Sequence, residues 1–219
     1  MELQGKRIVF LGDSITEGCG TSAKEHIYWN VIGRQTGAEV YADGIGGTRI
    51  ARQQVPTVER PWEDKYFASR VDDLPDEADV VVVFGGTNDF GHGDAAFGKM
   101  EDRTPDTFYG ACHELMLKLI NKYPAAQIVA MTPLHRLSED ETAYNESGVR
   151  RMGSLSRYVD AVAEVAAFYG IPVVDLYRTS GMQPRVEILR ERYMPDGLHP
   201  NDAGHLLIVR RLLGLLNTL

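Results

Sequence analysis

The sequence predicts an α/β protein, with a mostly parallel sheet of about five strands as the middle layer of a three-layer α/β/α sandwich. Short apolar or β-branched runs recur along the chain, and stretches with helical periodicity separate them. The run at 80–84 is continuously apolar, which is typical of a parallel strand that is buried on both faces. This alternation of strand and helix favours helices on both sides of the sheet.

The expected elements follow one another in chain order. The runs that we expect to form strands are residues 7–11, 39–42, 80–84, 127–131 and 172–176. Helical spacing is clearest in two sets of residues: Phe108, Cys112, Leu115, Leu119 and Ile120, and then Leu155, Val159, Val162, Val165 and Ala166. The last helix is expected from about Asp202 to Leu216, with Asn201 as its cap. Since no repeat or linker interrupts this order, residues 1–219 are expected to form a single domain.

Composition narrows the function classes. The chain is 43% hydrophobic and carries a net charge of -8, which argues against a nucleic-acid or anionic-membrane surface. No apolar run approaches the roughly 20 residues of a membrane span. Cys19 and Cys112 lack metal-ligand spacing, and no metal or other cofactor is expected. The first residues lack the pattern of a signal peptide, so we expect a cytoplasmic protein or a trimmed exported one.

A candidate catalytic triad joins the two ends of the chain. Ser14 follows the first expected strand, at the edge where open α/β sheets bind ligands, although a serine there can also be a turn or cap residue. Near the other end, Asp196 and His199 are three residues apart, so that one short turn can bring them together. A serine nucleophile needs a base and a group that orients the base. Ser14, His199 and Asp196 are therefore predicted to be nucleophile, base and orienting carboxylate.

Two further strand ends offer hydrogen-bond donors. Acyl transfer needs donors where the carbonyl oxygen becomes an oxyanion. Residues 43–48 after the second strand are rich in glycine, which exposes its backbone N–H, and Asn88 after the third strand supplies a side-chain amide. Asp13 and Asp89, which adjoin these positions, are expected to bond local backbone N–H groups and hold the turns.

Four sequence blocks resemble those of the SGNH hydrolases, also called GDSL esterases and lipases. In order, the blocks are Gly12-Asp13-Ser14-Ile15, Gly47, Gly86-Thr87-Asn88-Asp89 and Asp196-Gly197-Leu198-His199-Pro200. The resemblance spans residues 12–200 and implies a flavodoxin-like sandwich. It also implies that Ser14 is the nucleophile and that His199 and Asp196 complete the triad.

The same resemblance implies an oxyanion hole. Its donors would be the N–H of Ser14, the N–H of Gly47 and the side-chain amide of Asn88. The glycine block departs from the family pattern, because Ala42 stands where the family often has asparagine. Gly44 and Gly46 therefore remain rivals of Gly47.

Ester hydrolysis through an acyl-enzyme is the activity that the resemblance implies. The chain lacks both the Gly-x-Ser-x-Gly of α/β-hydrolases and the glycine string of dinucleotide-binding proteins. The absence of a long apolar lid favours a short acyl group such as acetyl, and aromatic loop residues favour a carbohydrate ester over other small molecules. A lysophospholipase, an acyl thioesterase and a non-catalytic module that binds an acylated glycan remain alternatives.

Several loop residues have no assigned role at this stage. Trp62 lies in the long connection 44–79, where aromatic residues can line a cleft or anchor the loop. His92, His135 and Arg136 follow strands, and the last two are candidates for binding the alcohol part of a substrate. The leucine-rich last helix is apolar on more than one side, which suggests a homo-oligomer.

Overall fold

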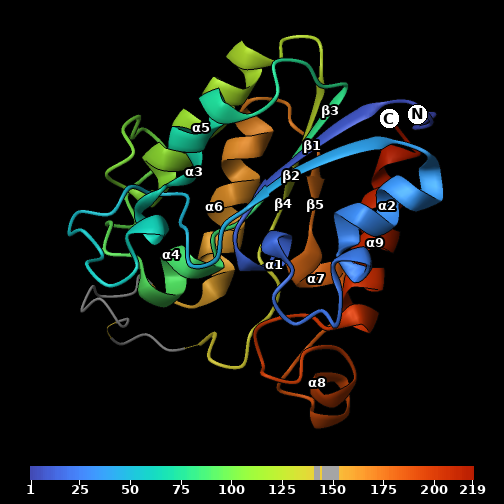
Figure 1. Cartoon of the computed structure of the whole chain (residues 1–219). Coiled ribbons are helices and arrows are strands. Elements are labelled where there is room, and N and C mark those ends of the chain that lie inside the picture. The colour runs from blue at the N-terminus through green and yellow to red at the C-terminus, as the bar shows by residue number, and fades with distance from the viewer. Residues whose placement is uncertain (141–143, 145–152) are drawn as a thin grey trace.

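The computed structural model describes residues 1–140, 144 and 153–219. Five strands form one sheet in the order β2-β1-β3-β4-β5, and all of its pairs are parallel (Figure 1). The strands are β1 Arg7–Gly12, β2 Glu39–Gly44, β3 Val80–Phe84, β4 Gln127–Met131 and β5 Val173–Val174. The predicted α/β class with a flavodoxin-like sheet is confirmed.

The fifth strand is shorter than the sequence predicts. Residues 172–176 were expected to be extended, yet only Val173 and Val174 pair with β4. Asp175 instead caps helix α7 (Leu176–Thr179), because its carboxylate accepts the backbone N–H of Arg178 at 2.9 Å. A helix start therefore ends the strand.

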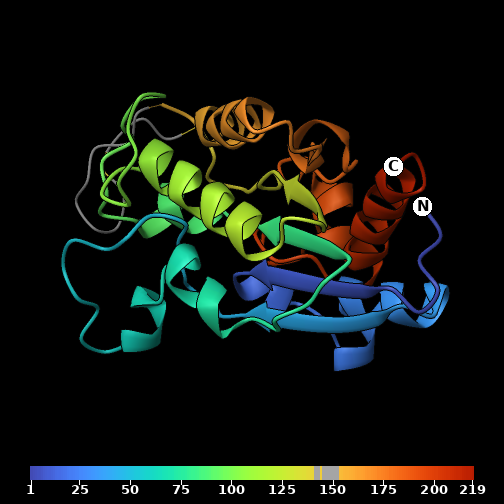
Figure 2. The same ribbon diagram turned by 90° about the horizontal axis from the view of Figure 1, so that it is seen from above.

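Helices cover both faces of the sheet (Figure 2). Helices on one face are α3 Phe67–Arg70, α5 Phe108–Lys122 and α6 Leu155–Phe168; those on the other are α2 Tyr28–Thr36, α7 and α9 Asp202–Leu216. Val9 and Leu11 belong to the first core, whereas Ile8 and Phe10 belong to the second. Successive strand side chains point to opposite faces, so β1 contributes to both cores.

Two short helices begin directly at the carboxyl edge of the sheet. They are α1 (Ser14–Glu17) after β1 and α4 (Thr87–His92) after β3. The remaining helices are α8 Glu187–Tyr193 and the 3₁₀ helices η1 Lys24–His26, η2 Pro61–Asp64 and η3 Val71–Asp73. The carboxyl edge therefore gathers α1, α4 and the loop after β2.

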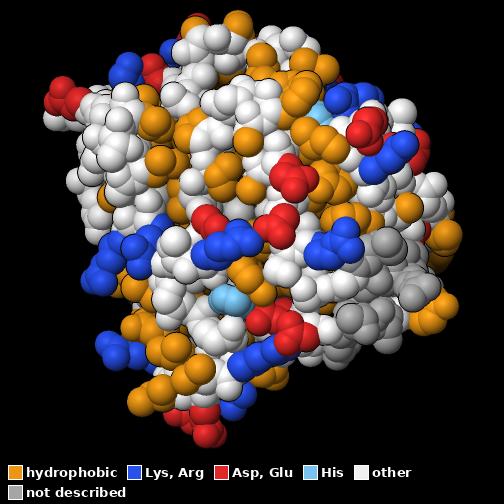
Figure 3. Space-filling view, turned by 180° about the vertical axis from the view of Figure 1, so that it is seen from behind, with side chains coloured by type: hydrophobic (Ala, Val, Ile, Leu, Met, Phe, Trp, Pro, Cys, Tyr) orange, Lys and Arg blue, Asp and Glu red, His pale blue; other side chains and the backbone are white. Residues whose placement is uncertain are grey.

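The two termini lie together, and the surface carries charges of both signs (Figures 1, 2 and 3). The two termini lie side by side in both ribbon views, and the Met1 ammonium donates to Leu216 O at 3.2 Å (Figures 1 and 2). Positive and negative side chains are interspersed on the face shown in Figure 3. Within the described residues, no helix combines the length and the apolar character that a membrane crossing needs.

Candidate active site

Ser14 is the first residue of α1, at the end of β1. A Cβ at Gly12 would lie 2.0 Å from Thr16 Oγ1, so only glycine lets the strand end this close to the helix. The carboxylate of Asp13 caps α1 by accepting the N–H of Ile15 at 3.0 Å. Within the described part of the chain, the backbone N–H of Ser14 makes no hydrogen bond. Neither the hydroxyl nor the N–H of Ser14 is therefore used to cap α1.

The structure brings the three predicted triad residues together. Ser14 Oγ lies 3.0 Å from His199 Nε2, and His199 Nδ1 lies 2.7 Å from Asp196 Oδ2. The other Asp196 oxygen accepts the N–H groups of Leu198 and His199 at 2.8 and 2.7 Å. Burial opposes ionisation of Asp196, but these bonds outweigh it and hold its pKa below the usual value. One compact turn thus aligns the carboxylate, the imidazole and the serine.

The loop after β4 supports this turn. Leu137 donates its N–H to Gly197 O at 2.8 Å. A Cβ at Gly197 would lie 2.8 Å from the Leu137 Cβ, and the backbone φ of Gly197 is 79°. Sequence reasoning did not find this contact, because nothing in the residue type of Leu137 marks it.

The three candidate glycines differ in the groups that pack against them and in the hydrogen bonds of their N–H groups. A Cβ at Gly44 would lie 2.2 Å from the backbone nitrogen of Glu17, so this glycine permits α1 to pack on β2. Gly46 donates its N–H to Glu17 Oε2 at 2.9 Å. Gly47 has φ 78°, and its N–H has no hydrogen-bond partner among the described residues. Glu63 packs on its α-carbon. These differences favour Gly47 as the donor, which remains a prediction.

Asn88 lies next to the glycine loop. Its side chain is in α4, where the residue is 6% exposed. Asn88 Nδ2 donates to Thr48 O at 2.9 Å, directly after Gly47. An amide carries two N–H groups, so this bond fixes the side chain and leaves one donor for a ligand.

One of the two neighbouring aspartates acts differently from the expectation. Asp13 bonds its own turn, as predicted. Asp89 instead accepts the N–H groups of Ile50 and Ala51 at 3.0 and 2.8 Å, which lie 39 and 38 residues away. Burial raises the pKa of Asp13 and of Asp89 to about 6. The local interpretation of Asp89 was wrong, because its partners come from the loop after β2.

Arg49 is a buried arginine that the sequence did not single out. Its guanidinium lies 2.7 Å from His92 Nδ1 and donates to Glu63 O at 3.0 Å and to Asp64 Oδ1 at 3.3 Å. Burial, together with the charge of Arg49, lowers the pKa of His92 to about 4. Arg49 therefore anchors η2, and His92 contacts this anchor.

The other loop residues without a role are also placed. His135 Nδ1 lies 2.7 Å from Glu139 Oε2. Arg136 Nη1 donates to Thr87 O at 3.1 Å, next to Asn88. Trp62 lies on η2 with 49% of its surface exposed. The two polar residues therefore make contacts within the protein, while Trp62 presents its ring to solvent.

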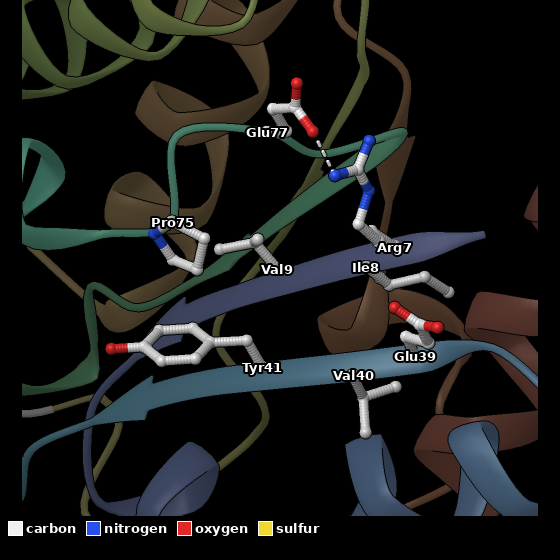
Figure 4. Close-up of a pocket in the computed structure, with 8 residues that line it drawn as sticks. All are labelled: Arg7, Ile8, Val9, Glu39, Val40, Tyr41, Pro75 and Glu77. Atoms are coloured by element: carbon white, nitrogen blue, oxygen red, sulfur yellow. Dashed lines mark hydrogen bonds and ion pairs between the residues drawn. The ribbon is translucent and has the colours of Figure 1, made fainter. Parts of the chain in front are cut away.

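A groove at the edge of the sheet lies apart from these groups (Figure 4). Its volume is about 190 Å³, and its lining residues are Arg7, Ile8, Val9, Glu39, Val40, Tyr41, Pro75 and Glu77. Arg7 and Glu77 form an ion pair across it. The groove lies over the first halves of β1 and β2, away from the carboxyl edge, and its lining contains no activated nucleophile.

Comparisons with known proteins are consistent with this geometry. Residues 10–207 match the model of the GDSL-like Lipase/Acylhydrolase family. A protein from Lactobacillus plantarum is 32% identical, with 98% of each chain covered and a TM-score of 0.81. A possible lipase from Chitinophaga pinensis is 22% identical (97% of this chain, 98% of that chain, TM-score 0.67). A putative arylesterase from Agrobacterium tumefaciens is 19% identical (97% and 99%, TM-score 0.66). No curated protein matches.

Proposed function

Because this chain belongs to the GDSL-like lipase and acylhydrolase family, we propose that it is a serine esterase that forms an acyl-enzyme on Ser14. One observation carries the proposal. An unbroken path of hydrogen bonds runs from Asp196 through His199 to Ser14, with distances of 2.7 and 3.0 Å. This is the arrangement that a serine hydroxyl needs, since it is a weak nucleophile without a positioned base.

Acylation follows from this arrangement. Ser14 Oγ attacks the ester carbonyl carbon while His199 Nε2 takes the hydroxyl proton. The carbonyl oxygen becomes an oxyanion, which accepts hydrogen bonds from the N–H of Ser14, the N–H of Gly47 and the amide of Asn88. The C–O bond to the alcohol then breaks, and His199 gives its proton to the departing alkoxide. The acyl group stays on Ser14.

Deacylation repeats these steps with water as the nucleophile and Ser14 Oγ as the leaving group. A water molecule attacks the acyl carbon while His199 Nε2 takes one of its protons. The same donors hold the second oxyanion. Collapse of this intermediate releases the carboxylic acid, and His199 returns the proton to Ser14 Oγ. Asp196 keeps the imidazole in one orientation throughout and stabilises its charged form.

For the substrate, we propose a short acyl ester, with acetyl groups on a carbohydrate as the favoured class. Trp62 supports the carbohydrate, because a half-exposed ring offers a flat face for a sugar. Trp62 also directly precedes Glu63, whose side chain lies against Gly47. The rivals within the same chemistry are a lysophospholipase and an acyl thioesterase.

A chain-length series tests the acyl group. We expect the highest kcat/KM for nitrophenyl acetate and falling values toward the decanoate, with acetyl released from acetylated xylan or mannan oligosaccharides. The Ser14→Ala variant is the control, because it measures the hydrolysis that does not depend on the proposed nucleophile. A preference for decanoate would remove the carbohydrate hypothesis and favour a lipid or thioester substrate.

Trp62→Ala tests the alcohol side. Loss of a stacking face should raise KM for an acetylated oligosaccharide about three- to tenfold, in line with roughly 1 kcal/mol for an aromatic contact. Nitrophenyl acetate, which has no sugar, is the control substrate and should keep its kcat and KM. Equal KM values for both proteins on the oligosaccharide would exclude Trp62 from sugar binding.

A further inference from the structure

Arg70 is a buried arginine beneath the three segments that carry the proposed oxyanion donors. We infer that it is a positioning residue, which sets the N–H of Ser14, the N–H of Gly47 and the amide of Asn88 at their mutual distances. This inference rests on the proposed esterase function. It concerns a residue that no sequence block singles out.

The guanidinium first joins the ends of two strands. Arg70 is 3% exposed, at the last position of α3. Its Nη2 donates to Gly12 O at 2.9 Å, two residues before Ser14. Its Nη1 donates to Asp43 O and to Asp43 Oδ2, each at 3.2 Å. The end of β1 and the end of β2 are thus held by one rigid group.

The same guanidinium reaches the third segment. Arg70 Nη2 also donates to the hydroxyl oxygen of Thr48 at 3.3 Å. Thr48 follows Gly47, and its carbonyl oxygen accepts the Asn88 amide at 2.9 Å. Asp43 and Thr48 therefore bracket the glycine loop, and Asn88 is connected to Arg70 through Thr48.

The chemistry of arginine suits this task. Its planar fork offers donors in fixed directions, whereas lysine offers one nitrogen on a flexible stem. The guanidinium also lies 4.8 Å from the Phe67 ring centroid, which limits its movement. Arg70 is bonded to backbone and to other side chains of the scaffold, so its effect on the reaction is exerted through the donors that it holds.

Arg70→Lys is the direct test. It keeps the charge but cannot bridge the three segments, so we expect kcat on nitrophenyl acetate to fall about 10- to 100-fold with KM within about twofold. A trifluoromethyl ketone forms a tetrahedral oxyanion adduct with a serine nucleophile. Its affinity should fall in parallel with kcat/KM, which general loss of stability would not produce.

Lys122→Met is the matched control for stability. Lys122 Nζ donates to the carbonyls of Val71, Asp72 and Leu74 at 3.0, 3.0 and 2.6 Å, directly after Arg70. It therefore also ties one cation to several backbone carbonyls, but not at the glycine loop. We expect a lowered melting temperature with kcat unchanged.

Thr48→Val and Thr48→Ser keep the test decisive if Arg70→Lys does not fold. The valine removes the acceptor for Arg70 and should lower kcat, while the serine keeps the hydroxyl and the wild-type kcat. Wild-type kcat in Arg70→Lys or, if that variant does not fold, in Thr48→Val would overturn the inference alone, and so would an equal loss of kcat in Lys122→Met. A wild-type protein that neither hydrolyses esters nor binds the ketone would overturn the proposed function, and the role of Arg70 with it.

Discussion

The contacts of Asp13 distinguish between two possible roles of Ser14, helix cap and nucleophile. A serine after a strand often caps the helix that follows. Here Asp13 accepts the N–H of Ile15, so capping is already provided. The Ser14 hydroxyl lies instead 3.0 Å from the imidazole of His199. Since Asp13 caps α1, the Ser14 hydroxyl is not needed as the cap, and this favours its role as the nucleophile.

Asn88→Ala tests the oxyanion hole at a single side chain. Loss of one donor should lower kcat by about 100- to 1,000-fold with little change in KM, because the bond strengthens only as charge develops. Asn30→Ala is the control, since its amide also donates to a backbone carbonyl, that of Lys24 at 3.2 Å, at an exposed site. Steady-state kinetics on nitrophenyl acetate measure both, and an unchanged kcat in Asn88→Ala would exclude the amide from the hole.

Among the elements, the turn after β2 determines which glycine can serve as a donor. The glycines at 44, 46 and 47 look equivalent in the sequence. Their surroundings differ, since α1 packs on the first, Glu17 binds the second and Glu63 lies against the third. The N–H of Gly46 is thus already donated to Glu17, whereas the N–H of Gly47 has no partner among the described residues.

Gly47→Ala and Gly46→Ala test this assignment as a pair. At Gly47, a Cβ would meet Glu63 Oε1 and the backbone φ of 78° disfavours a side chain, so the turn must shift. We expect kcat to fall about tenfold or more. At Gly46 the new Cβ would be too close only to the end of the flexible Glu17 side chain, 2.7 Å away, and would make an ordinary contact with Ser14 Cβ at 3.7 Å. The kcat should therefore stay within a few fold. The opposite ranking would assign the donor to Gly46.

Local patterns predicted the elements well but not the contacts between them. Helix α9 begins at Asp202 after the expected cap, because Asn201 and the apolar period that follows are neighbours in the chain. The partners of Asp89 and the contacts of Arg70 come from residues 22 to 58 positions away. Such contacts depend on how loops pack at the sheet edge, and a single sequence carries no periodic signal for them.

For the molecule as a whole, three buried groups and the partly buried His92 make the free energy of unfolding depend on pH in opposite directions. Burial raises the pKa of Asp13 and Asp89 to about 6, so their contribution to stability is present at low pH and is lost as pH rises through about 6. Burial lowers the pKa of His92 and His205 to about 4. The contribution of these histidines to stability is therefore present above about pH 6.5 and is lost as pH falls through about 4. The two pairs partly cancel between pH 4 and 6.5.

Asp13→Asn should disturb this balance. The asparagine can still accept the Ile15 N–H, but it no longer gains stability on acidification. From pH 6.5 to 4, the variant should lose more free energy of unfolding than the wild type, by an amount on the order of 1–3 kcal/mol. Urea unfolding at a series of pH values measures this difference.

Asp79→Asn provides a control of opposite sign. Hydrogen bonds from Arg7 N–H and Lys6 lower the pKa of Asp79, so the wild type loses this stability as pH falls. The Asp79→Asn variant should therefore be less sensitive to acid than the wild type. Parallel pH profiles for Asp13→Asn and the wild type would contradict a raised pKa of Asp13.

Covalent labelling shows whether the Ser14 hydroxyl is an activated nucleophile. A fluorophosphonate probe reacts with a serine that a neighbouring base activates, and peptide mapping locates the adduct. We predict one adduct per chain, on Ser14, with none in Ser14→Ala and much slower labelling in His199→Ala. If the folded wild-type chain stays unlabelled, or if Ser14→Ala is labelled equally well, Ser14 is not the activated nucleophile.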